Sequence, residues 1–204
     1  MLPVAPPRIW TRFLPTAALP SALPTDARVT NYRIDAIEPI HGNLALPFAA
    51  GAELTRVESE TTLLAHEAGL TGVTGHVVYT DRAPRAELAQ ISAKESGPCA
   101  VLIPIRKSPA WWALAQDERT NTFRGAHKSP GHHAIGTDYA ARIFRRLYHA
   151  RSLPGSNWDF LTYFEFPESQ RPTFVELLRR LRDPRENPEW EFVDAEVECW
   201  MKKL

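Results

Sequence analysis

The sequence contains few cysteines, no long apolar run and no surplus of charge of either sign. Cys99 and Cys199 are the only cysteines, and they form no CxxC pair. A disulfide framework or a structural zinc site is therefore not expected, and a reducing cytosol is the expected compartment. No stretch of about 18 apolar residues occurs, so we expect no membrane span. The N-terminal residues also lack the charged start and apolar stretch of a signal peptide.

The charges cancel, with 24 Lys+Arg against 24 Asp+Glu. Nucleic acids and anionic membranes attract proteins that carry an excess of cationic charge, so neither is expected as a partner. The hydrophobic fraction of 44% and the length of 204 residues are typical of a globular chain with one domain or two small ones.

Proline, in contrast, is abundant, and six of the 18 prolines lie within the first 28 residues. Proline cannot donate a hydrogen bond to a helix or a central strand. Residues 1–28 are therefore predicted to form a Pro-rich N-terminal arm, either extended along the body of the protein or present as a flexible tail.

The rest of the chain divides into a weak and a strong pattern. In residues 29–97, strands are expected at 33–39 and 75–80, and short helices at 53–67 and 83–92. In residues 98–204, strands are expected at 100–105, 158–166 and 193–201, and helices at 110–123, 138–150 and 174–181. This order predicts an α+β fold with helices on one face of an antiparallel sheet. We expect a ferredoxin-like α+β barrel with a reduced N-terminal half (29–97) and a more complete C-terminal half (98–204).

Several titratable side chains are candidates for a functional site. Residues His127, His132 and His133 share one loop, and imidazole is a common ligand of transition metals. Their spacing matches no zinc motif, so a solvated polar loop is the alternative interpretation. On the predicted helix 138–150, Arg145 lies beside Tyr148 at the border of the apolar side. There its guanidinium can hold a small anion in a cavity, whereas Arg142 and Arg146 are expected to face water.

Two tryptophans and two glutamates have open interpretations. Adjacent Trp111 and Trp112 point about 100° apart on a helix, so one is expected in the core and the other can line a pocket. Glu186 and Glu189 are surface carboxylates unless a buried partner is supplied. Lys107 opens a predicted helix and can bind an acidic group, while the other lysines considered, Lys94 and Lys128, are expected to be solvated. No nucleophile elbow, Walker loop, dinucleotide fingerprint or kinase motif is present.

A set of short motifs runs through the C-terminal half. They are Ile103-Pro104-Ile105-Arg106-Lys107, Trp111-Trp112, Glu118-Arg119, His132, Tyr139, Arg145-Arg146-Leu147-Tyr148-His149 and Asp159-Phe160-Leu161-Thr162-Tyr163-Phe164-Glu165. Through them, residues 100–204 resemble the chlorite dismutase family of haem b proteins, whose subunits are dimeric α+β barrels. Residues 34–97 resemble the family only loosely, and residues 1–28 are not covered.

The resemblance implies roles for individual residues. The family's iron ligand is a histidine 13 residues before the arginine of the Arg-Arg-Leu-Tyr-His block, which is His132 here. Arg145 would then hold the anionic substrate, and either Glu189 or Glu186 would accept the ligand's other N–H. Trp111 and Trp112 match the family's pocket tryptophans, and Lys107 is placed near a haem propionate.

The implied activity is that of a haem b-dependent oxidoreductase that decomposes chlorite to chloride and O₂ or acts on peroxide. The implied assembly is a homo-oligomer, with a dimer favoured for a chain whose N-terminal half is reduced. The alternative is a haem-free family member that binds another metal or a small molecule through the His127/His132/His133 loop.

Overall fold

The protein was analysed as a computed structural model, which describes residues 8–75, 93–95, 97–125 and 129–204. Most of the expected strand at 75–80, the whole expected helix at 83–92, and the side chains of His127 and Lys128 lie outside the described residues.

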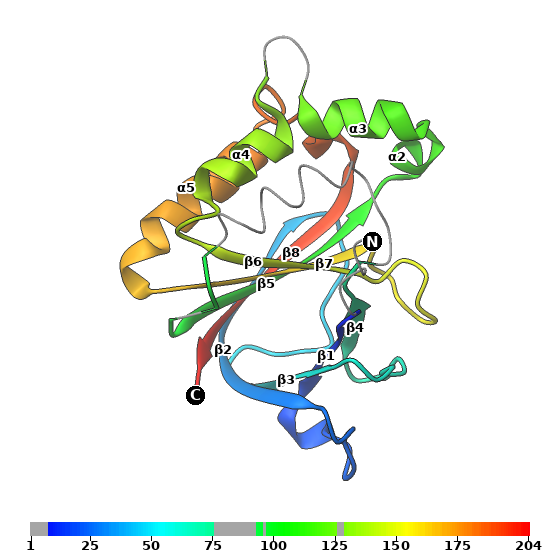
Figure 1. Cartoon of the computed structure of the whole chain (residues 1–204), viewed down its shortest axis with the longest axis vertical. Coiled ribbons are helices and arrows are strands. Elements are labelled where there is room, and N and C mark those ends of the chain that lie inside the picture. The colour runs from blue at the N-terminus through cyan, green and yellow to red at the C-terminus, as the bar shows by residue number, and fades with distance from the viewer. Residues whose placement is uncertain (1–7, 76–92, 96, 126–128) are drawn as a thin grey trace, which may run out of the picture.

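Eight strands close an antiparallel barrel (Figure 1). They are β1 (Trp10–Pro15), β2 (Arg28–His41), β3 (Glu53–Ser59), β4 (Leu70–Val73), β5 (Cys99–Lys107), β6 (Phe144–His149), β7 (Phe160–Phe166) and β8 (Val193–Lys203). Around the barrel, the N-terminal half has the order β4-β1-β3-β2 and the C-terminal half has the order β8-β5-β7-β6. Both halves thus place the fourth strand beside the first and the third between the first and second. The predicted ferredoxin-like α+β barrel is confirmed.

The helices belong to the C-terminal half. Between β5 and β6 lie α2 (Pro109–Ala113), α3 (Gln116–Arg124) and α4 (Gly131–Tyr139). Between β7 and β8 lie the 3₁₀ turn η2 (Glu168–Gln170), α5 (Arg171–Leu181) and the 3₁₀ turn η3 (Pro188–Phe192). Within residues 8–75, the only helical segment is the 3₁₀ turn η1 (Thr16–Ala18), so the described part of the N-terminal half has fewer helices than the C-terminal half. In the described part of the chain, no helix is long and apolar enough to cross a membrane.

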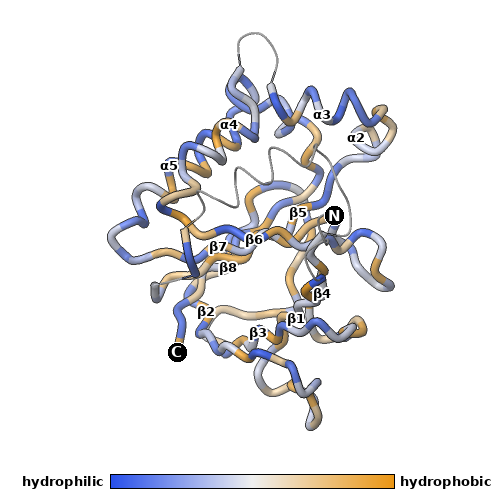
Figure 2. Tube along the Cα trace, in the orientation of Figure 1, coloured by the Kyte–Doolittle hydropathy of each residue, from blue (hydrophilic) through white to orange (hydrophobic). Residues whose placement is uncertain are grey.

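Two apolar cores form on the two faces of the C-terminal sheet. The first fills the barrel with side chains such as Phe13, Tyr32 and Tyr163. The second lies between the outer face of the sheet and the pair α4 and α5, which cover that face side by side (Figure 1). Figure 2 shows α3 as largely hydrophilic, whereas α4 and α5 alternate hydrophilic and hydrophobic residues along their turns. Helices α4 and α5 therefore cover the outer face of the sheet, and a site can form between the two layers.

The prediction of an N-terminal arm is wrong for residues 10–15. Strand β1 pairs with β3 and with β4, and both Phe13 and Leu14 are fully buried. The prolines nearest to this segment are Pro7 and Pro15, so residues 8–14 form a proline-free stretch with normal donors. Pro15 stands at the end of the strand, where a missing N–H is tolerated.

The predicted helices at 53–67 and 138–150 are also wrong. Residues 53–59 form β3, which is held on both sides by β1 and β2. Helix α4 ends at Tyr139, and residues 144–149 form β6, which pairs with β7 along its whole length. The expected helix at 110–123 is present as two segments, α2 and α3. Ser108 caps the first by accepting the backbone N–H of Trp111, as serine commonly does at the N-cap position.

Candidate functional site

A cavity lies between the outer face of the C-terminal sheet and the segments α3, α4 and η3. Its volume is about 90 Å³. The strands contribute alternate residues, because every second side chain of a strand points to the same face. Ile103, Ile105 and Lys107 come from β5, and Arg145 and Leu147 come from β6. The lining is largely apolar, with a few polar groups, which is typical of a cofactor or small-molecule site.

His132 is held in this cavity by a buried carboxylate. Its Nδ1 lies 2.9 Å from Oε2 of Glu189. The other carboxylate oxygen, Oε1, lies 2.8 Å from Nζ of Lys107, which also donates to the backbone oxygen of Glu189 at 3.3 Å. The ring of Phe123 stacks on the imidazole, with 5.0 Å between the ring centroids. Three residues, from β5, α3 and η3, therefore orient the imidazole that α4 carries.

The charges of this group define its proton positions. Burial alone would raise the pKa of Glu189, but Lys107 and His132 outweigh it and hold that pKa well below its usual range. Glu189 is thus an anion and can only accept hydrogen bonds. Nδ1 of His132 faces this anion at 2.9 Å, which favours the tautomer that carries its proton on Nδ1 and leaves Nε2 as the metal-ligating nitrogen.

Arg145 lines the same cavity without a partner of its own. It forms no hydrogen bond or ion pair with any residue that the structure describes, and its side chain is half-buried. Burial lowers its pKa, an effect that the charge of Glu189 opposes. A guanidinium with unused donors inside a partly closed cavity is suited to binding a small anion.

The sequence model of the family described as chlorite dismutase matches residues 49–191. The chain belongs to the chlorite dismutase family. A dimeric chlorite dismutase from Nitrobacter winogradskyi is 30% identical and superposes with a TM-score of 0.71, covering 94% of this chain and 99% of that chain. No curated protein sequence matches the chain.

More distant solved structures share the fold. A variant of the chlorite dismutase from Candidatus Nitrospira defluvii is 20% identical and has a TM-score of 0.67, covering 98% of this chain and 93% of that chain. The chlorite dismutase of the same organism in complex with imidazole is also 20% identical, with a TM-score of 0.66 and coverage of 96% and 91%. The family match begins within the N-terminal half, where the sequence motifs give only a loose resemblance.

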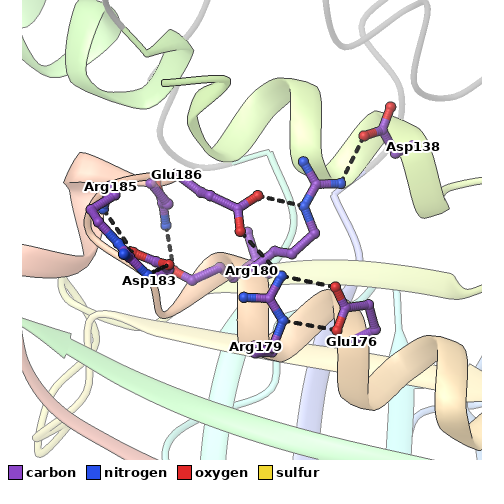
Figure 3. Close-up of polar contacts among 9 residues, drawn as sticks. Asp138, Glu176, Arg179, Arg180, Asp183, Arg185 and Glu186 are labelled. Atoms are coloured by element: carbon purple, nitrogen blue, oxygen red, sulfur yellow. Dashed lines mark hydrogen bonds and ion pairs between the residues drawn. The ribbon is translucent and has the colours of Figure 1, made fainter. Parts of the chain in front are cut away.

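The two candidate glutamates occupy different environments. Glu189 contacts His132, whereas the carboxylate of Glu186 lies 2.7 Å from Nε of Arg180 and 3.2 Å from Nη2 of Arg179 (Figure 3). Of the two, only Glu189 is therefore placed to accept the imidazole N–H. Lys107 contacts Glu189, and its placement near a haem propionate stays a prediction.

Trp111 and Trp112 are not among the described residues that line the cavity. Trp111 is almost fully buried, with its ring 5.4 Å from that of Phe192 and 5.0 Å from Nζ of Lys107. The ring of Trp112 stacks on the ring of Phe160, a residue that lines the cavity. Each tryptophan therefore contacts a residue that lines the cavity: Trp111 contacts Lys107, and Trp112 contacts Phe160.

The other two arginine candidates, Arg146 on β6 and Arg142 just before it, have different surroundings. Arg146 faces the barrel interior, where Nη1 lies 2.5 Å from the buried Glu58, so the expectation that it faces water is wrong. Arg142 is exposed, as expected. Among the described residues, no group of three His, Cys, Asp or Glu side chains can hold a metal ion. The metal-binding loop with His127 stays a prediction, because His127 lies outside those residues.

Glu196 and Phe123 are among the cavity residues that the sequence did not single out. Glu196 lines the cavity and accepts from Nε of Arg182 at 2.8 Å, although the alternation of β8 predicts a solvent-facing side chain. Phe123 was treated only as the end of a helix. In both residues the decisive partner comes from a distant segment, so a local pattern does not reveal it.

Proposed function

We propose that the protein binds haem b through His132 and acts as an oxidoreductase on a small oxyanion, with chlorite as the first candidate substrate. One observation carries the proposal: the anchored imidazole of His132 and the unpaired guanidinium of Arg145 line the same cavity. The chain also belongs to the chlorite dismutase family over residues 49–191, which supports this class of chemistry.

The residues present fit haem b. A largely apolar cavity between two layers suits the macrocycle, and His132 presents Nε2 as an iron ligand while Nδ1 is occupied. The ionised Glu189 lies beside Nδ1 and favours the tautomer that leaves Nε2 free to bind iron. Lys107 holds Glu189 in its ionised form, because a buried carboxylate without a cation would take up a proton.

The chain's own residues bind and orient the substrate. When bound, the haem supplies the redox-active iron that exchanges oxygen atoms with the oxidant. Arg145 attracts the anion, orients it through its parallel donors and retains the anionic product of the first step in the cavity. The overall conversion, chlorite to chloride and O₂, is balanced in atoms and charge. Peroxide is the second candidate substrate.

The assembly proposed for the protein is a homodimer. The support is the dimeric chlorite dismutase from Nitrobacter winogradskyi, of which this chain covers 99% at 30% identity. Sedimentation of the purified protein at several concentrations measures the subunit number directly.

Hemin titration tests the cofactor. We expect one hemin per chain and a sharp Soret band, which His132→Ala abolishes and the neighbouring His133→Ala retains. An unchanged Soret band in His132→Ala would show that the ligand is assigned wrongly. Stoichiometric copper or zinc in place of haem would favour the alternative metal-binding function.

Oxygen evolution tests the substrate. With chlorite and hemin-loaded protein, Arg145→Gln is expected to lower the rate about 100-fold, the typical loss when one electrostatic donor is removed from a reacting centre. Arg142→Gln, which changes an exposed arginine three residues away, should leave the rate unchanged. If the loaded wild-type protein releases no O₂ from chlorite, the dismutase activity is excluded and peroxide turnover becomes the remaining proposal.

A further inference from the structure

Arg180 joins the two segments that carry the ends of the His132–Glu189 contact (Figure 3). It lies in the last turn of α5. Its Nη1 is 2.9 Å from Oδ2 of Asp138, near the end of α4, and its Nε is 2.7 Å from Oε2 of Glu186 in the loop after α5. One guanidinium therefore connects α4, the helix of His132, with the loop that leads into η3, the turn of Glu189.

A backbone hydrogen bond makes a second connection between Glu186 and α4. The backbone N–H of Gly131, the first residue of α4, donates to the backbone oxygen of Glu186 at 2.9 Å. Glu186 thus reaches the start of α4 through its backbone and the end of α4 through its carboxylate and Arg180. We call the set Gly131, Asp138, Arg180 and Glu186 the α4 bridge. His132 is the residue directly after Gly131, inside this bridge.

The α4 bridge restricts movements of α4 that apolar packing alone does not restrict. Helix α4 packs on the sheet through residues such as Ile135 and Tyr139, and this apolar attraction does not depend on direction. Movement of α4 relative to η3 would alter the 2.9 Å contact between His132 and Glu189, because its two ends lie on these two segments. Polar bonds at both ends of α4 oppose that movement.

We propose that Arg180 is a positioning residue that holds α4, and with it His132, in place against Glu189. The consequence for the bound cofactor rests on the proposed function, whereas the bridge itself does not. Arginine is required because its planar fork serves two carboxylates in different directions, while a lysine offers one charged nitrogen.

Arg179 provides a matched control on the same helix. It pairs with Glu176 and also reaches Glu186 at 3.2 Å, but it makes no contact with α4 among the described residues. Its side chain is 55% exposed, compared with 20% for Arg180. Replacing either arginine by glutamine removes one charge from the same helix turn, and only Arg180→Gln breaks the bridge.

The first measurement uses the protein without hemin. Amide hydrogen exchange at the start of α4 should be about fivefold faster in Arg180→Gln than in the wild type. Arg180→Lys should give an intermediate rate and Arg179→Gln an unchanged one. Equal exchange rates in the wild type and Arg180→Gln would overturn the bridge, whatever cofactor the protein binds.

The second measurement uses the hemin-loaded protein. Weaker hydrogen bonding at Nδ1 makes the imidazole less basic, so Arg180→Gln should lower the iron–imidazole stretching frequency and make the midpoint potential more positive. Glu189→Gln should move both in the same direction and further. If Glu189→Gln moves them and Arg180→Gln does not, the positioning role is wrong and the proposed function stands. If the wild type binds no hemin, the proposed function and the cofactor role fall together, and the exchange rates still decide the bridge.

Discussion

Replacing Glu189 by glutamine tests the central claim about the site, that a buried anion joins Lys107 to His132. The substitution keeps the size of the side chain and removes its charge. The amide can offer its oxygen to only one of the two donors, so its NH₂ group must face the other. Lys107, whose side chain is only 5% exposed, then keeps its charge without a carboxylate beside it.

The expected cost follows from the distance and the burial. At an effective dielectric constant of about 20, unit charges 2.8 Å apart attract by about 6 kcal/mol. Much of this offsets the desolvation of both groups, so the pair itself is a weak stabiliser. Removing one partner of a buried pair nevertheless costs about 3–5 kcal/mol, because the other charge stays buried. We expect Glu189→Gln to lower the free energy of unfolding by about 3 kcal/mol at neutral pH.

The pH dependence gives a sharper test than the size alone. The folded-state pKa of Glu189 is lowered from its ordinary value of 4.5 by Lys107 and His132. The stabilisation is therefore complete above the unfolded-state pKa and is lost as the pH falls towards the folded-state value. Since glutamine does not titrate, the difference between wild type and Glu189→Gln should be largest near neutral pH and should shrink below pH 4.5.

Urea unfolding of both proteins without hemin measures this difference, with an unchanged m value as the sign that only stability has altered. Glu176→Gln is the matched control. It removes an exposed carboxylate paired with the exposed Arg179 and should cost less than about 1 kcal/mol. A loss of less than 1 kcal/mol in Glu189→Gln, or a difference that grows as the pH falls, would refute the assignment of a buried anion.

Two further predictions concern the frame of the site and of the barrel. Gly131 has a φ of 74°, and a Cβ there would lie 2.3 Å from the backbone nitrogen of Gly125, so Gly131→Ala should cost more than about 2 kcal/mol in urea unfolding. Burial raises the pKa of Tyr32 to about 12 and also raises the pKa values of Tyr148 and Tyr163. These three phenols should give no phenolate absorbance up to about pH 11, where stability already falls because the unfolded chain ionises first.

The sequence predicts the fold class because the C-terminal strands carry their own signals. The apolar run at 100–105, the aromatic run at 158–166 and the alternation from 193 each match a strand. The two large errors concern strands whose stability comes from distant partners. Strand β1 depends on β3 and β4, and β6 depends on β7, so their pairing energy is invisible in a local window.

The error over residues 138–150 has a specific physical origin. On a helical wheel, Tyr148 and Arg145 are near neighbours, because positions three apart share a helix face. On the actual strand they point to opposite sides, Tyr148 into the barrel and Arg145 into the cavity. Placing Arg145 in a cavity from the helix geometry gave the right location from a wrong element. The choice between Glu186 and Glu189 was open for a related reason, since it depends on how the turn η3 reverses the chain.

The neutral composition of the chain does not reveal why the cavity would prefer an anionic ligand. Cations and anions balance over the chain, and they nearly balance within the cavity too, because Glu189 is matched by Lys107 and Glu196 by Arg182. Counting charges would therefore assign this cavity no preference for an anion. The preference that we propose arises from pairing: Arg145 is the cavity cation that has no ion-pair partner among the described residues. A field that depends on one unpaired group can be reversed by one substitution, which is why Arg145→Gln should impair anion binding without altering the fold or the anchoring of His132.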